Sequence, residues 1–203
     1  MGTRGCYGFH SGEKDKLTYN HSDSYPTYLG FNILSFVHNT PESELRAVAD
    51  RIELVDEDSA PSPEQIETFK GYSDVSVGTQ TLTDWYCLLR QTQGDLAPYR
   101  DGLRHMIDSH DFLKGSLFCE WAYIINVDTL ELEIYKGFNT RKYVKNGGRY
   151  AKYCLDEKPV CGKKYYGVTL LATLKLSDIR TMTLEEIKVF CSATEESVYN
   201  RNN

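Results

Sequence analysis

The sequence lacks long hydrophobic runs. No stretch of the 203 residues approaches the roughly 18 consecutive apolar residues of a membrane-spanning helix. Residues 1–6 are not followed by the apolar run of a secretory signal. These two absences predict a cytoplasmic protein with no membrane contact.

Paired cysteines and catalytic signatures are missing as well. The six cysteines include no C-x-x-C pair, and the closest two are Cys154 and Cys161. This spacing argues against a disulfide framework and structural zinc, and predicts reduced, mostly buried thiols. No Walker loop, G-x-G-x-x-G, G-x-S-x-G or H-E-x-x-H motif occurs. We therefore expect no metal and no cofactor.

The composition is that of a folded globular protein, with 40% hydrophobic and 26% charged residues. The length predicts a single domain over residues 1–203. The net charge of −6 conceals two oppositely charged islands. Residues 136–164 contain nine Lys or Arg and two acidic residues, whereas residues 42–67 contain nine acidic residues and two Arg. Either island is a possible surface for a protein partner.

The pattern of strands and helices predicts an α+β fold. Two hairpins, over residues 3–21 and 116–137, form a mainly antiparallel sheet, and a further strand is expected over residues 168–176. Helices are expected over residues 28–37, 41–51, 63–72, 85–94, 99–109 and 183–193. Residues 138–164 read as a basic, tyrosine-rich irregular or edge segment, and residues 196–203 as a frayed tail.

An acidic residue in the central hairpin is the first candidate for chemistry. Strand alternation over residues 116–127 places Glu120 with Phe118 and Ala122, on a strand that we expect to be buried on both sides. A carboxylate there must be paired, hydrogen-bonded or protonated, and a raised pKa suits a general acid or base. The structural alternative is that Glu120 is a buried partner for an arginine or a tyrosine hydroxyl.

The N-terminal hairpin supplies the other candidates. Alternation predicts that Tyr19, His21 and Asp23 share a face, so that Asp23 could orient the His21 imidazole as a catalytic base. Arg4, on the paired strand, could hold an anion in the same pocket. The alternative is a simple turn at the end of the hairpin. The expected ligand-binding residues are Arg4, Tyr19, Tyr25 and Trp121.

A third cluster contains His105, Asp108, His110 and Asp111. His105 and Asp108 lie three residues apart in the predicted helix and could share a face. The spacing matches no metal site that we can name, and a solvated helix end is the preferred interpretation.

Four sequence blocks resemble an uncharacterised protein family. They are MGTRG at residues 1–5, YNHSDSYP at 19–26, LRHMID at 103–108 and SLFCEWAY at 116–123. The family occurs in fungi and other microbial eukaryotes, and related N-terminal sequences occur in bacteria and phages. The resemblance covers about residues 1–137, implies no activity, and leaves residues 138–164 unexplained.

Three functions remain open from the sequence. The first is a binding module for a small polar or anionic ligand, held by Arg4, His21, Asp23 and Glu120. The second is a hydrolase-type enzyme that uses the same pocket, with His21 or Glu120 as general base. The third is a protein–protein interaction module that acts through the charged islands. Nucleic acid is a disfavoured partner: residues 141–153 interleave cations with tyrosines, but the acidic total weakens attraction to a polyanion.

Overall fold

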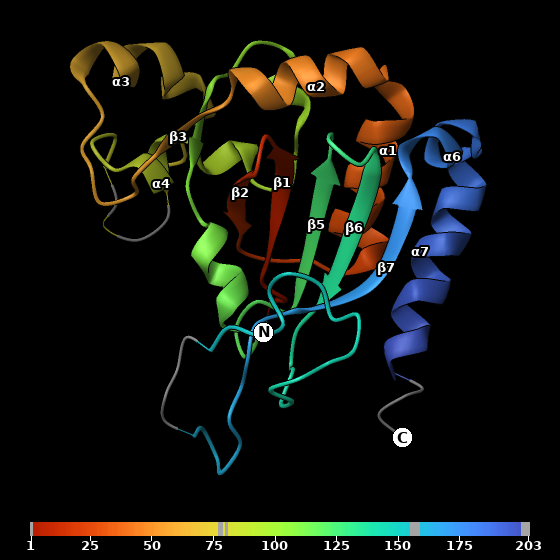
Figure 1. Ribbon diagram of the computed structural model, residues 1–203. Coiled ribbons are helices and arrows are strands. Elements are labelled where there is room, and N and C mark those ends of the chain that lie inside the picture. The colour runs from red at the N-terminus through yellow and green to blue at the C-terminus, as the bar shows by residue number, and fades with distance from the viewer. Residues whose placement is uncertain (1, 77–78, 80, 155–158, 200–203) are drawn as a thin grey trace.

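A five-stranded sheet forms the centre of the protein (Figure 1). The computed structural model describes residues 2–76, 79, 81–154 and 159–199. The strand order is β2-β1-β5-β6-β7. The strands are β1 (Gly5–Ser11), β2 (Lys14–Asn20), β5 (Trp121–Asn126), β6 (Glu131–Lys136) and β7 (Thr169–Lys175). Only β1 and β5 are parallel; the other neighbours in this sheet are antiparallel. The predicted α+β class with a mainly antiparallel sheet is confirmed.

The turn of the central hairpin is formed by local hydrogen bonds. The Asn126 side-chain oxygen accepts hydrogen bonds from the backbone N–H groups of Asp128 and Thr129, at 3.1 and 3.0 Å. An asparagine that bonds backbone groups a few residues ahead is a common turn former. Leu130 then adopts a left-handed φ of 59°. The turn predicted around residues 128–129 is therefore confirmed.

Helices cover one face of the sheet. They are the π-helical turn η1 (Pro26–Gly30), α1 (Phe31–Asn39), α2 (Glu42–Arg51), α6 (Leu176–Thr181) and α7 (Leu184–Tyr199). Tyr7, Phe9, Tyr123 and Ile125 point from β1 and β5 into this main core and are fully buried. Burial of such large apolar side chains is the dominant stabilising contribution of the fold.

The second face of the sheet is covered without long helices. Cys6, Leu17, Ala122 and Ile124 form a smaller core there with Tyr150 and other residues. The cover comes from the 3₁₀ helix η4 (His110–Lys114) and the segment 138–168. In its described part this segment contains turns and an isolated bridge between Val160 and Lys163. The irregular character predicted for residues 138–164 is confirmed for those residues.

A small lobe at the left of Figure 1 completes the protein. Its elements are β3 (Glu53–Val55), α3 (Pro63–Phe69), η2 (Lys70–Tyr72), α4 (Trp85–Leu88), η3 (Arg90–Thr92), α5 (Ala97–Arg100) and β4 (His105–Ile107). Strands β3 and β4 pair in parallel.

The helix predicted over residues 99–109 is wrong. Gly102 has a φ of 122°, which ends the helix, and the chain then pairs as β4 because Met106 and Ile107 are buried.

The predicted start of one strand, and the predicted boundary between the last helix and the tail, need correction. The strand predicted from residue 116 begins at Trp121, and residues 116–118 form a turn before it. The helix predicted to end at residue 193 continues to Tyr199, so residues 196–199 belong to α7; residues 200–203 lie outside the described part. No described helix has the length and apolar character needed to cross a membrane.

Candidate functional site

His21 and Asp23 lie in an open hollow with a volume of about 370 Å³. We call it the amide hollow, and the side chains used below are His21, Asp23, Asn32, Arg90, Gln91 and Gln93. It lies between the end of β2, α1 and the segment that contains η3. Strand β2 ends at Asn20, so His21 and Asp23 follow the strand and do not continue its alternation. The sequence predicted for both residues a pocket shared with Arg4 and Glu120; the hollow that they line is formed instead with α1 and the η3 segment.

Three amide side chains of this hollow are each held at one end. Asn32 Nδ2 donates to the Gly94 carbonyl at 3.4 Å, and Gln91 Nε2 donates to the Ser73 carbonyl at 2.8 Å. Gln93 Oε1 accepts from the His21 backbone N–H at 3.2 Å. In the described part of the chain, the opposite polar atom of each amide has no protein partner. Two acceptors and one donor are thus fixed in position while they remain open to a ligand.

Gly94 forms part of the wall of the amide hollow and requires glycine. Its φ is +81°, and a Cβ there would lie 3.3 Å from Asn20 Oδ1. Its backbone N–H is held by the Tyr7 hydroxyl at 2.9 Å, which in turn donates to the Thr92 carbonyl at 2.8 Å. Because Tyr7 is fully buried, this wall is tied directly to the main core and is rigid.

The amide hollow continues into a second hollow of about 380 Å³ along α1. The two share Asn32, Gln93 and Gly94, and the second adds Ser35 and Arg100 among others. The Ser35 hydroxyl is buried and has no hydrogen-bond partner among the described residues. A buried polar atom without a partner costs about 1–3 kcal/mol.

Tyr19 and Tyr25, both predicted to bind ligand, have different positions. The Tyr19 hydroxyl lies 3.2 Å from His21 Nδ1, and this contact, not one with Asp23, orients the imidazole. Burial raises the pKa of the Tyr19 hydroxyl, and the neighbouring Tyr86 adds to the effect. Tyr25 contributes its carbonyl, which accepts from the N–H groups of Tyr28 and Gly30 within η1.

Arg4, Glu120 and Trp121 lie together at the same end of the sheet as His21, because Gly5 at the start of β1 pairs with both Asn20 and Trp121. The Glu120 N–H donates to the Arg4 carbonyl at 3.0 Å, and the Arg4 guanidinium lies 4.8 Å from the centre of the Phe118 ring. Glu120 is half-buried and precedes β5, so the prediction that it lies within a strand buried on both sides is wrong. Its carbonyl accepts a hydrogen bond from Lys136 Nζ at 3.1 Å. Arg4 and Glu120 line neither of the hollows described above.

Lys136 is the chemically unusual group at that end. Its ammonium lies 4.6 Å from the centre of the Trp121 ring and 4.8 Å from that of Phe138. Burial lowers the pKa of Lys136 to about 8, against the opposing effect of Glu120. The Trp121 ring is buried beneath it. The roles assigned to Arg4, Glu120 and Trp121 stay predictions.

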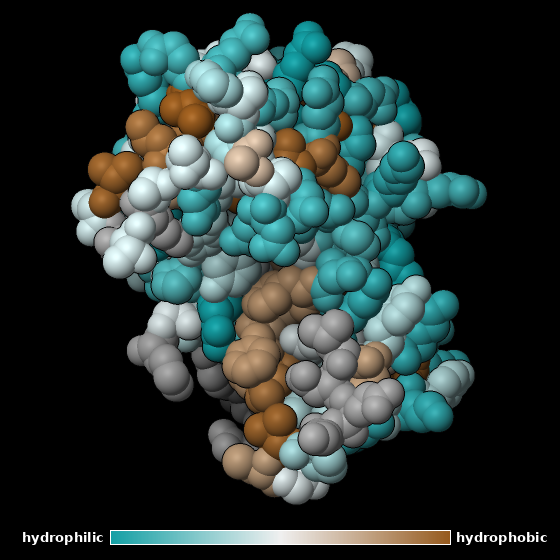
Figure 2. Space-filling model, turned by 90° about the vertical axis from the view of Figure 1, so that its left-hand side faces the viewer, coloured by the Kyte–Doolittle hydropathy of each residue, from teal (hydrophilic) through white to brown (hydrophobic). Residues whose placement is uncertain are grey.

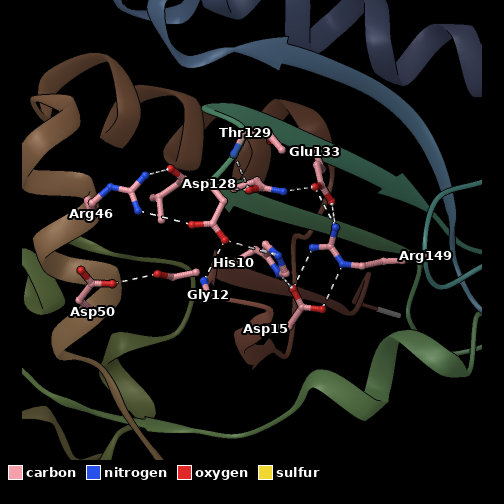
Figure 3. A network of polar contacts seen from close by, with 12 residues as sticks. His10, Gly12, Asp15, Arg46, Asp50, Asp128, Thr129, Glu133 and Arg149 are labelled. Carbon is pink, nitrogen blue, oxygen red and sulfur yellow. Dashed lines mark hydrogen bonds and ion pairs between the residues drawn. The ribbon is translucent and has the colours of Figure 1, made fainter.

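The charged side chains on the second face of the sheet form a dense polar network (Figure 3). Arg149 Nη1 donates to both carboxylate oxygens of Glu133, at 2.8 and 2.7 Å. Arg149 Nη2 and Nε donate to the two oxygens of Asp15, at 2.8 and 3.2 Å. His10 Nδ1 lies 2.8 Å from Asp15, and Asn126 donates to Glu133 at 2.8 Å.

Figure 3 also shows Asp128, which accepts hydrogen bonds from the Gly12 N–H at 2.8 Å and from Arg46 at 3.4 Å.

This network anchors the segment 138–168 to the sheet. Arg149 belongs to that segment, whereas Asp15 and Glu133 belong to β2 and β6. Burial opposes ionisation of Asp15, but hydrogen bonds from Arg149 and the Tyr150 hydroxyl outweigh it and hold the pKa of Asp15 below its ordinary value. Every oxygen of both carboxylates is already engaged. The network is therefore closed, and its role is structural.

Several of these residues were missed from the sequence. Glu131, Glu133 and Tyr135 alternate along one face of their strand, which reads as a solvent-facing face, and no pattern in the sequence shows that Arg149 covers it. The polar run from Arg90 to Gly94 was interpreted as a helix end. The signal for a polar loop is the pair of glutamines two residues apart before a glycine.

Comparison of the chain with protein-family models, with curated proteins and with solved structures finds no match. The family resemblance of residues 1–137 therefore stays a prediction, and the function must be inferred from geometry. In the part of the chain that the structure describes, no group of three or more His, Cys, Asp or Glu side chains is placed to hold a metal ion.

Proposed function

We propose that the protein is a binding module for a small polar ligand, and that the ligand occupies the amide hollow. One observation carries this proposal: Asn32, Gln91 and Gln93 are each anchored at one end and open at the other. Side chains held in place before binding lose little conformational entropy when a ligand arrives. A hollow of about 370 Å³ lies within the size range of small-molecule sites.

The charges of the amide hollow favour an uncharged ligand. Arg90 contributes one positive charge, while Asp23 and Asp74 contribute two carboxylates. A single cation beside two carboxylates is a poor site for an anion, since the carboxylates repel it. Amides, carboxylates and one guanidinium suit a ligand with several hydroxyl groups, which both donate and accept hydrogen bonds. We therefore narrow the ligand class to sugars and polyols.

A thermal-shift screen of monosaccharides, disaccharides, polyols and nucleosides tests this proposal. A ligand at about one hundred times its dissociation constant adds about 2.7 kcal/mol to the free energy of unfolding. For a chain of this length that corresponds to a rise in melting temperature of roughly 5–10 °C. We expect at least one sugar or polyol to give a saturable rise.

Two variants test whether the ligand binds in the amide hollow. Gln93→Ala and Asn32→Ala each remove one of the open amides, and we expect each to abolish most of the shift. Ser192→Ala, at an exposed position on α7, is the control and should respond like the wild type. A rise that survives both amide substitutions would contradict the proposal, as would the absence of any rise across the panel. Recovery of the ligand unchanged separates binding from the hydrolase alternative.

A further inference from the structure

A third hollow, of about 500 Å³, has a different lining from the two described above. We call it the aromatic hollow. It lies between the end of β2, the loop after β3, α4 and η4, which are elements at the left of Figure 1. Its principal side chains are Tyr19, Tyr86, Phe112, Glu57, Asp108 and Asp111. Figure 2 views the protein from that side: the upper half is largely hydrophilic, and hydrophobic side chains gather lower down, at the height of η4 and the segment 138–168.

Three rings from three separate segments form the walls of the aromatic hollow. The Tyr19 and Phe112 rings are nearly perpendicular, with an interplanar angle of 87° and centroids 5.2 Å apart. The Tyr86 ring is tilted by 41° from Tyr19, with centroids 6.3 Å apart. Rings set at an angle to one another present several π faces to one space. The rings pack against one another, and all three residues border the hollow, so a cation seated there would meet aromatic surface.

One of these rings already stacks with a cation. The Arg90 guanidinium lies 4.8 Å from the centre of the Tyr86 ring, and Nη1 of Arg90 donates to the Tyr86 hydroxyl. Arg90 itself lines the amide hollow. No lysine or arginine is among the residues that line the aromatic hollow, although Arg4 and Arg90 lie close enough to Tyr19 to act on its hydroxyl.

Carboxylates surround the same space. Asp108 and Asp111 each engage His110 through one oxygen, Oδ1, at 2.7 and 2.9 Å, and Oδ1 of Asp111 also pairs with the Lys114 ammonium. Their Oδ2 atoms have no partner among the described residues. Glu57 forms no hydrogen bond or ion pair with the described residues. The protein atoms around Glu57 raise its pKa by desolvation, and Asp84, Asp58 and Asp56 raise it further.

We propose that the aromatic hollow binds a small organic cation, held by the rings of Tyr19, Tyr86 and Phe112 and by the carboxylates of Glu57, Asp108 and Asp111. The rings favour an ammonium group with alkyl substituents, because such a group makes apolar contact and is attracted to the π faces at once. A bare metal ion fits less well, since only carboxylates of this lining would bind it. The inference is independent of the ligand proposed for the amide hollow.

Choline and its uncharged carbon isostere 3,3-dimethylbutan-1-ol make the sharpest pair of probes. The two have the same shape and differ in charge alone, so their difference in affinity measures the attraction to a cation. Titration calorimetry of the full-length protein should show saturable binding of choline. The isostere should bind at least about tenfold more weakly, because it lacks the attraction of the cation to the π faces and to the carboxylates.

Two variants and two matched controls assign binding to this hollow. Phe112→Leu keeps an apolar side chain but removes the ring, and we expect it to weaken choline binding about 3- to 30-fold. Glu57→Gln removes one charge at an exposed position and should weaken it about threefold without affecting the fold. Phe138→Leu and Glu185→Gln make the same changes at exposed positions outside the hollow and should bind choline like the wild type.

The result that overturns the proposal is equal affinity for choline and the isostere, or no choline binding to the folded wild type. Unchanged choline affinity in Glu57→Gln and Phe112→Leu would overturn it as well, since the binding site would then lie elsewhere. Because Glu57 is exposed, its variant remains informative even if Phe112→Leu proves unstable.

Discussion

The polar network and the amide hollow contain similar side chains but differ in what those side chains bind. In the network, Asp15, Glu133 and Arg149 satisfy one another completely, and no polar capacity remains. In the amide hollow, Asn32 and Gln93 use one end each and leave the other open. A cluster of charged side chains is therefore weak support for a functional site, whereas fixed side chains with unused donors and acceptors are stronger support.

The largest effect expected from this comparison comes from Arg149→Met. Asp15 and Glu133 would then remain buried, at 13% and 8% side-chain exposure, without their cation. Breaking a buried ion pair from one side costs about 3–5 kcal/mol. Urea unfolding monitored by fluorescence should show this loss. Arg141→Met, at an exposed position of the same segment, should cost less than about 0.5 kcal/mol. A loss of under 1 kcal/mol in Arg149→Met would mean that the network does not hold the segment.

Acid should weaken the same network by a smaller amount. The pKa of Asp15 is lower in the folded protein than in the unfolded chain, so the unfolded chain binds its proton first. The stabilisation is therefore complete above the unfolded pKa of about 3.9 and is lost as the pH falls through the folded pKa. Each unit of lowering corresponds to about 1.4 kcal/mol.

Urea midpoints measured between neutral pH and pH 2 check this sign. The wild type should lose stability more steeply below about pH 4 than Asp15→Asn, which has no carboxyl to protonate at that position. Parallel pH profiles for the two proteins would show that Asp15 does not contribute, and would place the acid sensitivity elsewhere.

The smallest effect on stability is expected in the amide hollow. Gln93→Ala removes a half-exposed side chain with one hydrogen bond to a backbone N–H. Its free energy of unfolding should change by less than about 1 kcal/mol, whereas ligand binding should be lost. If Gln93→Ala instead destabilised the protein as strongly as Arg149→Met, the two regions would be alike, and the amide hollow would be structural.

Much of the fold could be predicted from the sequence because its signals are local. The two hairpins carry strand alternation and turn residues, and Ser62 with Gln65 forms a capping box at the start of α3. The pairing of β1 with β5 was not predicted, since parallel pairing between distant strands leaves no local signal. The helix predicted over residues 99–109 was wrong for a related reason: burial of Met106 beside β3 outweighs local helix preference.

The candidate site likewise has a part that local sequence signals predict and a part that they do not. Short polar stretches that interrupt apolar patterns, such as those around His21 and Asp23, can be recognised from sequence. Their neighbours Arg90, Gln91 and Gln93 come from a segment about seventy residues away, and only the folded chain brings them together. Glu120 was singled out because it interrupts an apolar run, but its strand begins one residue later, which removes the burial on which the prediction depended.

The parallel pairing of β1 with β5 also determines when the sheet can form during synthesis. Gly5 pairs with Trp121 and His10 with Asn126, so the N-terminal hairpin must wait for more than half of the chain. At about 5–20 residues per second, the wait is on the order of ten seconds. Throughout it, the edge of β1 that pairs with β5 lacks its native partner. The nascent chain therefore exposes an unpaired strand edge until β5 leaves the ribosome.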